Sequence, residues 1–263
     1  IKTSINDEYR FIIDLGSFSY IEIIKNKFLF IMGVSGNIDC LYENQKKIIV
    51  ENLQIKQYTF IPSIFGRHRR CEKDIFVGED ENSYLNNIIT ATKEANILKK
   101  PVLIFVKDIS TMKKLSCILD KESLFYITVQ ETYTLEDILK IVKWATKPSA
   151  ITLFTRSFVR GTDFDIGSFV ADNGGCLAIQ TYIHEDFSEY VQVRGRIARK
   201  GSPGIYYFCI FKGDLEKINF NTKICNDNIS NSTKLFKQIN IAIEKKFNEN
   251  FEKMKMMNND CLE

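Results

Sequence analysis

The chain has 263 residues, of which 44% are apolar and 26% charged, and a formal net charge of +3. This length allows one large domain or two small ones with a substantial core, and a charge so near zero excludes a nucleic-acid or membrane role that depends on net attraction alone. Seven scattered cysteines without a C-x-x-C pair, beside only two histidines, exclude a typical zinc site and indicate a reduced, cytosol-type compartment.

Short apolar runs alternate with helical stretches along the chain. The expected strands are 27–34, 58–63, 101–106, 124–129, 150–155, 176–183 and 204–211, and the expected helices between them include 41–53, 81–100, 110–121 and 134–145. Helix starts are marked by Asp80, Ser110 and Thr134. Apolar strands separated by helices predict an α/β fold, a doubly wound parallel sheet with helices on both faces. No apolar run reaches the roughly 18 to 20 residues of a membrane span.

Polar, motif-like segments follow three of the expected strands. They are Gly33–Gly36, Arg156–Asp165 and His184–Gln192. Open parallel sheets bind ligands at the carboxyl ends of their strands, so we expect these segments along one rim of the sheet.

The segment R-G-T-D, residues 160–163, follows the expected strand 150–155 by a few residues. Gly161 would let the backbone approach a ligand closely, and Asp163 could accept hydrogen bonds from a ribose or hold an arginine. The alternative is a tight loop with an Asx-type turn.

The segment Y-V-Q-V-R-G-R-I-A-R-K-G-S-P-G, residues 190–204, concentrates positive charge. Arg196 and Arg199 are three apart and would share one face of a helix, which the residues 201–204 would end. Two guanidiniums on one face suit a polyphosphate, because each offers fixed, always-charged donors. The alternative is a solvated basic face.

The composition changes after about residue 213. A polar, loop-like stretch leads to an amphipathic helix with Leu235, Ile239, Ile243, Phe247, Phe251 and Met254 at helical spacing. We therefore expect a domain at 1–213 and a loop with a C-terminal helix at 214–263, either docked on the domain or starting a helical scaffold.

Taken together, these segments strongly resemble the second motor domain of SecA, the ATPase that drives preproteins through the Sec channel and a relative of DEAD-box-type helicases. The matching residues are Arg160, Gly161, Thr162, Asp163, Gly174, Gly175, Ile179, Thr181, His184, Glu185, Gln192, Arg194, Gly195, Arg196, Arg199, Gly201, Pro203 and Gly204. Looser likeness extends upstream through Leu15, Ser17, Tyr20, Gly33 and Gly36. The chain departs from the family pattern at Arg156–Val159, Ile197, Ala198, Ser35 and Ser202, and at residues 65–67.

The resemblance implies a RecA-like fold that supplies one side of an ATP site shared with a first motor domain. It implies catalytic roles at the phosphates for Arg196 and Arg199, and nucleotide binding by Arg160, Gly161, Asp163 and Gln192. Residues 33–36 would couple the nucleotide state to motion between the motor halves, and His184 with Glu185 would form a structural hydrogen-bonding pair.

The sequence contains no Walker-type G-x-x-x-x-G-K-[ST] loop and no acidic pair following a strand. We therefore expect ATP as cofactor, as Mg-ATP only together with the first motor domain, no metal site of its own, and no hydrolysis by this chain alone. The implied partners are that upstream domain, a preprotein and a membrane channel, in a cytoplasmic location peripheral to a membrane. Two alternatives remain. A nucleic-acid helicase-type motor would use Arg67, Arg69, Arg70 and Lys73, which otherwise form an ordinary basic loop, and a binding module would have lost the activity.

Overall fold

The computed structural model describes residues 24, 27–221 and 232–260. The chain divides into two units, residues 1–36 with 43–59 and residues 37–42 with 60–263. The boundary at residue 213 expected from composition stays a prediction.

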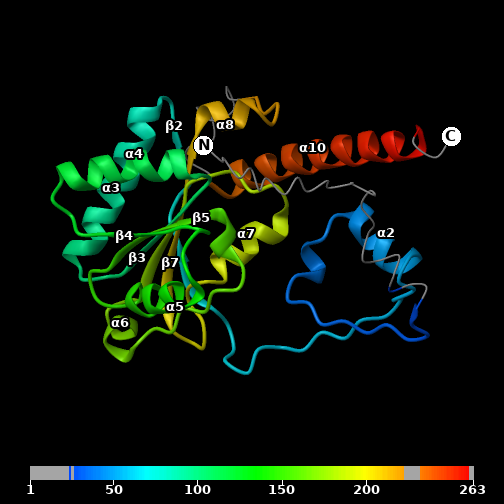
Figure 1. Ribbon diagram of the computed structural model, residues 1–263, viewed down its shortest axis with the longest axis horizontal. Coiled ribbons are helices and arrows are strands. Elements are labelled where there is room, and N and C mark those ends of the chain that lie inside the picture. The colour runs from blue at the N-terminus through cyan, green and yellow to red at the C-terminus, as the bar shows by residue number, and fades with distance from the viewer. Residues whose placement is uncertain (1–23, 25–26, 222–231, 261–263) are drawn as a thin grey trace, which may run out of the picture. The chain divides into compact units, whose positions relative to one another are not determined.

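In the first unit the described residues form helix α2 (Glu43–Glu51) and irregular segments (Figure 1). The strands expected at 27–34 and 58–63 are wrong, because neither segment forms a strand in the described residues. Leu29 and Phe30 are 100% and 91% exposed. An apolar run becomes a strand only where a neighbouring strand takes up its backbone hydrogen bonds, and no described strand pairs with these residues.

The second unit contains a seven-stranded sheet in which every described pair is parallel. Its strands are β1 (Arg69–Glu72), β2 (Phe76–Gly78), β3 (Val102–Val106), β4 (Ile127–Val129), β5 (Ile151–Thr155), β6 (Cys176–Gln180) and β7 (Pro203–Phe211). The order is β1-β7-β6-β3-β5-β4, and β2 pairs with the later part of β7. Strands β1 and β2 escaped sequence analysis because they are short and β1 reads Arg-Arg-Cys-Glu, in which the single apolar residue, Cys71, is exposed.

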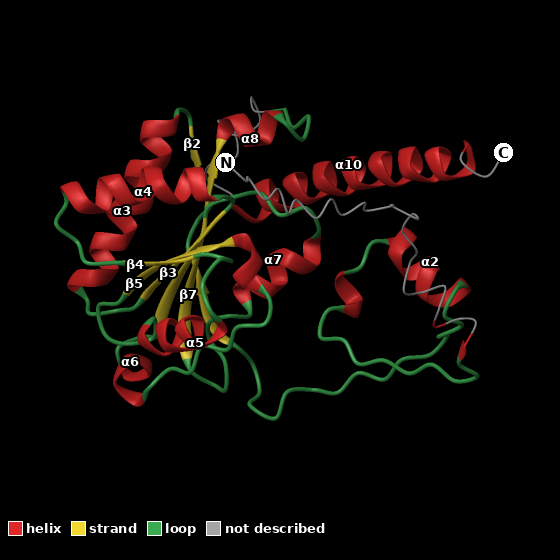
Figure 2. Cartoon of the chain, viewed as in Figure 1, coloured by secondary structure: helices red, strands yellow, loops and turns green. Residues whose placement is uncertain are grey.

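Helices connect these strands and cover them. They are α3 (Glu81–Ile97), α4 (Ile109–Lys121), α5 (Leu135–Trp144), α6 (Ser168–Asp172), α7 (Phe187–Arg194), α8 (Lys212–Glu216) and α10 (Ser232–Asp260), with two 3₁₀ turns, η1 (Ile38–Cys40) and η2 (Arg156–Val159) (Figure 2).

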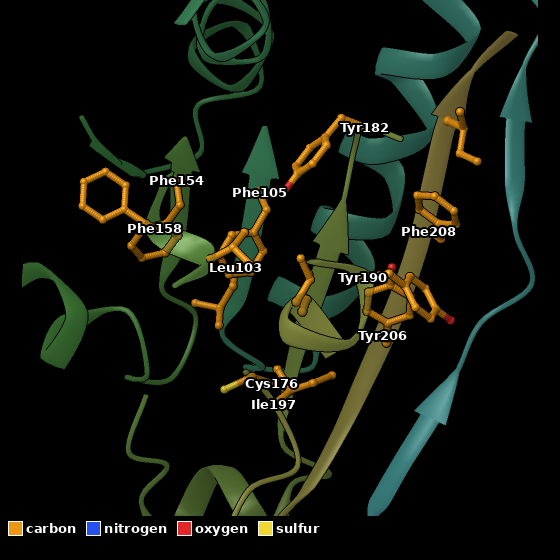
Figure 3. Packing of buried hydrophobic residues seen from close by; sticks show 14 of the residues in the cluster. Leu103, Phe105, Phe154, Phe158, Cys176, Tyr182, Tyr190, Ile197, Tyr206 and Phe208 are labelled. Atoms are coloured by element: carbon orange, nitrogen blue, oxygen red, sulfur yellow. The ribbon is translucent and has the colours of Figure 1, made fainter. Parts of the chain in front are cut away.

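Successive side chains of the strands point to opposite faces and build two cores. Leu103 and Phe105 of β3 pack in the core of one face (Figure 3), whereas Val102, Ile104 and Val106 pack with residues of α3 and α4 on the other. Residues of α5, α6, α7, α8 and α10 cover the first face. The doubly wound parallel sheet with helices on both faces is therefore confirmed, as is the C-terminal helix, which buries Leu235, Ile239 and Ile243.

The start of α4 shows how a side chain close in sequence caps a helix. Asp108, and not Ser110 as predicted, caps the helix: its Oδ1 accepts hydrogen bonds from Thr111 N at 2.8 Å and Thr111 Oγ1 at 2.9 Å. Asp108→Ala should lower the free energy of unfolding by about 1 kcal/mol, because an N–H of the first turn loses its acceptor. Ser110→Ala, a change at an exposed position inside the first turn, should leave stability within about 0.5 kcal/mol. Urea unfolding of both variants checks this, and equal losses would contradict the assignment of the cap.

Candidate functional site

A loop of residues 156–165 leaves the carboxyl end of β5 and runs beside α7 and the turn that follows α7. Among the contacts that join the two segments are those of Arg156 with Glu189, Arg160 with Gln192, Arg196 with two loop carbonyls, and Arg199 with Asp163. We call this row of contacts the seam. It brings together the residues that were predicted to bind the nucleotide or to act at its phosphates.

Arg196 and Arg199 lie beyond the helix that was expected to carry them. Helix α7 ends at Arg194 and Gly195 is its C-cap, so the prediction that both arginines share a helix face is wrong. Ala198 and Lys200 both have positive φ, 54° and 52°, which is incompatible with a continuing right-handed helix. The turn nevertheless directs both side chains to the loop of residues 156–165.

Arg196 is buried, and its guanidinium holds the loop. Its Nε donates to the carbonyl oxygen of Val159 at 2.5 Å, and Nη1 donates to that of Thr162. The pKa of Arg196 is lowered to about 10, mainly by burial and to a smaller extent by the positive charge of Arg199. The side chain therefore keeps its charge at neutral pH, while two of its nitrogens donate hydrogen bonds within the chain.

Arg199 and Asp163 form a partly exposed ion pair. Arg199 Nη1 contacts Asp163 Oδ1, and Nε donates to the carbonyl oxygen of Gly195 at 2.7 Å. The side chain of Asp163 is 64% exposed. Since an exposed ion pair is worth only about 1 kcal/mol or less, an anionic ligand could replace Asp163 as the partner of Arg199.

Arg160 and Gly161 complete the exposed part of the seam. Arg160 Nε donates to Gln192 Oε1 at 2.9 Å. Gly161 has a φ of +76°, and no atom lies within 4 Å of the position where a Cβ would stand. The backbone here therefore leaves room for close approach, and nucleotide binding by Gly161 stays a prediction.

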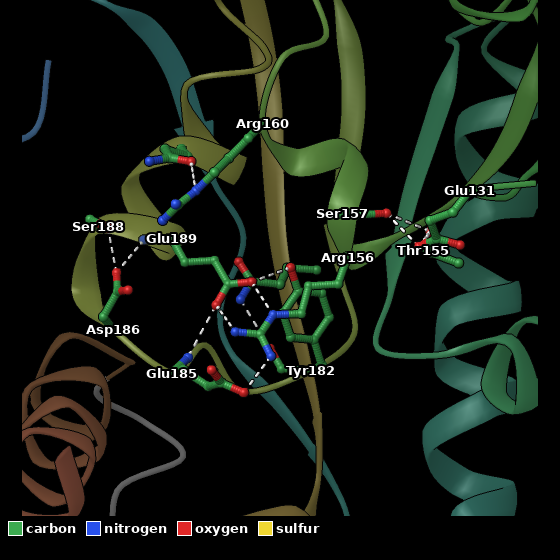
Figure 4. A network of polar contacts seen from close by, with 12 residues as sticks. Glu131, Thr155, Arg156, Ser157, Arg160, Tyr182, Glu185, Asp186, Ser188 and Glu189 are labelled. Atoms are coloured by element: carbon green, nitrogen blue, oxygen red, sulfur yellow. Dashed lines mark hydrogen bonds and ion pairs between the residues drawn. The ribbon is translucent and has the colours of Figure 1, made fainter. Parts of the chain in front are cut away.

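The expected rim is only partly formed. Arg156 directly follows β5 and contacts Glu185 and Glu189, which follow β6, so these segments meet across the end of β3 (Figure 4). Arg196 and Arg199 instead precede β7, toward the amino ends of the strands. Residues 33–36 follow no strand, because 27–34 forms none, and they belong to the first unit.

Sequence reasoning missed the role of Arg156 and Glu189. Arg156 donates to both carboxylate oxygens of Glu189, from Nε at 2.5 Å and from Nη2 at 2.8 Å, and from Nη1 to Glu185 Oε1 at 2.5 Å. These bonds raise the pKa of Arg156 further above its already high value. The departure of residues 156–159 from the family pattern was the one available signal.

His184 and Glu185 do not form the expected pair with each other. His184 Nε2 is hydrogen-bonded to Asn240 Oδ1 of α10 at 2.9 Å, and the ring lies among Phe187, Tyr190, Phe208 and Phe236. Burial lowers the pKa of His184 to about 4. The imidazole is therefore neutral at physiological pH.

Two of the basic residues in the stretch 67–73, Arg70 and Lys73, contact other parts of the fold. Arg70 of β1 donates to Glu72 Oε1 at 3.2 Å and to the carbonyl oxygen of Arg194 at 3.3 Å. Lys73 pairs with Glu94 of α3 at 3.3 Å. These two cations therefore serve contacts within the fold.

Across the described residues, no group of three or more His, Cys, Asp or Glu side chains is arranged to hold a metal ion. Of the helices formed by the described residues, none has both the length and the apolar character that crossing a membrane requires.

Comparison with known proteins points to one family. No protein-family model matches the sequence. Protein translocase subunit SecA of Syntrophobacter fumaroxidans is 36% identical over 167 residues, which cover 62% of this chain and 20% of the relative. SecA of Lachnoclostridium phytofermentans is 32% identical over 143 residues, 54% of this chain and 17% of the relative. The chain therefore spans about a fifth of the length of these curated relatives.

Among solved structures, domain 2 of a DEAD-box helicase bound to an RNA duplex is 20% identical, with a TM-score of 0.44 and 57% of each chain covered. The Escherichia coli DEAD-box protein SrmB is 13% identical, with a TM-score of 0.43, and 60% of this chain and 85% of SrmB are covered. The similarity to SecA rests on the sequence relatives. They confirm the resemblance that the motifs indicated: over the matched residues the chain is similar to SecA.

Proposed function

We propose that this chain is the second motor domain of a SecA-like ATPase and supplies one side of an ATP site that a first motor domain completes. The observation that carries the proposal is the seam, where Arg160, Gly161, Asp163, Gln192 and Arg199 gather on one exposed strip. Sequence similarity to SecA supports the assignment independently of this geometry.

Each residue of the strip has a definite chemical task in this proposal. Arg199 exchanges Asp163 for phosphate oxygens and neutralises charge that develops during phosphoryl transfer. Asp163, once released, accepts hydrogen bonds from the ribose, and Gly161 lets the nucleotide reach the backbone. Arg160, held by Gln192, is a second phosphate donor.

Arg196 acts at the same site from below the surface. Two of its nitrogens, Nε and Nη1, are bonded to the carbonyl oxygens of Val159 and Thr162, so it fixes the loop that presents Asp163. Its predicted catalytic contact with a phosphate stays a prediction.

The wider role follows from the relatives, which are named protein translocase subunits. We propose that the complete protein uses Mg-ATP, with Mg²⁺ held by the first motor domain, to drive protein translocation from a cytoplasmic position at a membrane. A preprotein and a membrane channel are its proposed partners. Since the chain lacks a Walker-type loop, it should not hydrolyse ATP by itself.

ATP binding to the chain tests the proposal directly. Isotope-labelled protein titrated with ATP should show chemical-shift changes at Gly161, Asp163 and Arg199. Arg199→Ala should raise the dissociation constant for ATP about tenfold, because a charge-assisted hydrogen bond to phosphate is lost. In a complete protein with both motor domains, the same change should lower ATP hydrolysis about a hundredfold.

Lys200 offers the matched control. It is the next residue, carries the same charge and contacts Asp165 of the same loop at 3.4 Å. Lys200→Ala should change the dissociation constant by less than about twofold, since an exposed cation contributes mainly screened attraction. Equal weakening by both changes, or ATP-induced shifts that avoid the seam, would contradict the proposal.

A further inference from the structure

Glu189, in the first turn of α7, has the most complete set of donors around any carboxylate of the seam. Both oxygens accept from Arg156, Oε1 also accepts from Tyr182 Oη at 3.0 Å, and Oε2 accepts from the backbone N–H of Glu185 at 3.1 Å. Its side chain is 7% exposed. The charge of Glu189 is therefore buried and fully compensated (Figure 4).

The guanidinium of Arg156 is held in a single orientation by this arrangement. Two of its nitrogens face Glu189, a third faces Glu185, and its carbon lies 5.8 Å from the centroid of the Tyr182 ring. A two-pronged contact between two planar groups fixes their relative angle as well as their separation. Arg156 thus joins the end of β5 to the start of α7 in a defined geometry.

The position of this pair along the seam explains what it can do. The seam contacts at Arg160 and Asp163 are partly exposed and weak. Glu189 and Arg196 are buried, and Arg156 is half-buried. The exposed residues thus lie between or beside two anchors, each of which includes a buried side chain. Residues 160–163 have no regular secondary structure, so these anchors set where their side chains point.

An ion pair with one buried and one half-buried partner adds little net stability, because the cost of desolvating the charges offsets much of their attraction. A geometric role fits Arg156 and Glu189 better than a stabilising one. We propose that Arg156 and Glu189 are positioning residues, which hold the loop of residues 159–165 against α7 so that Arg160 and Asp163 are placed for a phosphate-bearing ligand. The ligand rests on the proposed function, whereas the placement of the loop does not.

Amide hydrogen exchange of the chain without nucleotide tests the placement. Arg156→Gln and Glu189→Gln should each speed exchange in residues 159–165 by about tenfold, because the loop opens locally without its anchor. Exchange in β3 and β6 should stay within about twofold of the unsubstituted chain. Glu185→Gln is the matched control: it removes another partner of the same guanidinium, but an exposed one, and should leave the loop within about twofold.

A third variant keeps the test decisive even if Arg156→Gln or Glu189→Gln does not fold. Arg156→Lys keeps a charge beside Glu189 but cannot make the two-pronged contact, and it should give the same confined acceleration in milder form. Acceleration spread evenly over β3, β6 and the loop would overturn the positioning role in favour of a purely structural one. The same acceleration in Glu185→Gln would also overturn it.

Titration with ATP separates this inference from the proposed function. Arg156→Gln should raise the dissociation constant for ATP about tenfold while Arg199 remains in place. If the unsubstituted chain binds no ATP, the proposed function fails, and the exchange experiment still decides whether Arg156 and Glu189 position the loop. Unchanged ATP affinity in a variant whose loop exchanges faster would overturn the link between loop placement and phosphate binding.

Discussion

Gly175→Ala should lower the free energy of unfolding by about 4 kcal/mol or more, a loss at the upper end for a single substitution. Gly175 stands immediately before β6 with a φ of +79°, and a Cβ added there would lie 1.8 Å from the carbonyl oxygen of Pro203 and 2.5 Å from its carbon. Those atoms belong to the backbone at the start of β7, so no side-chain rotation relieves the clash. Strands β6 and β7, which pair from Cys176 and Gly204 onward, would have to separate at this end.

Gly174 provides the matched control for that experiment. Its φ is +90°, so alanine is strained there too, but the nearest atom to an added Cβ is the flexible end of Lys100, with Nζ at 2.8 Å. Gly174→Ala should therefore lower stability by about 1 kcal/mol, mainly through backbone strain. Urea unfolding of both variants measures the difference. Equal losses would show that close packing against β7 does not explain the glycine at 175.

Acidification should destabilise the fold through His184 by roughly 3 kcal/mol between about pH 6.5 and pH 4. Burial, the largest influence, lowers the pKa of His184 from 6.5 to about 4, while the hydrogen bond with Asn240 and the charge of Asp186 act in the opposite sense. Between these pH values His184 is protonated in the unfolded chain but neutral in the folded chain. The free energy of unfolding must then fall as the pH falls.

The contribution of His184 can be isolated by comparison. His184→Phe keeps an aromatic ring in its aromatic surroundings and removes the titrating group, so its stability should vary less between pH 6.5 and pH 4 than that of the unsubstituted chain. Urea unfolding across this pH range gives both slopes. An unchanged slope in His184→Phe would contradict a buried, neutral His184.

Sequence alone determined the interior of the sheet and the position of most helices. The runs 101–106 and 150–155 are apolar at every position but one or two, and they form the buried strands β3 and β5. Asp80 and Thr134 cap α3 and α5 as predicted, because capping needs only the neighbouring backbone. The order of motifs also indicated SecA, since those residues are recognisable without knowledge of their contacts.

Tertiary structure decided which equally plausible patterns became strands and which charges became accessible. Residues 28–32 are all apolar, as β3 is, yet they form no strand, whereas the polar β1 is one because β7 offers it a free edge. Arg196 and Arg199 look alike in sequence, but the turn after α7 buries one against the carbonyls of Val159 and Thr162 and leaves the other beside Asp163. Strand pairing and burial depend on residues distant in sequence, and so does the bond between Arg156 and Glu189. Local pattern fixes what a segment can form, and long-range contacts decide which of those forms it takes.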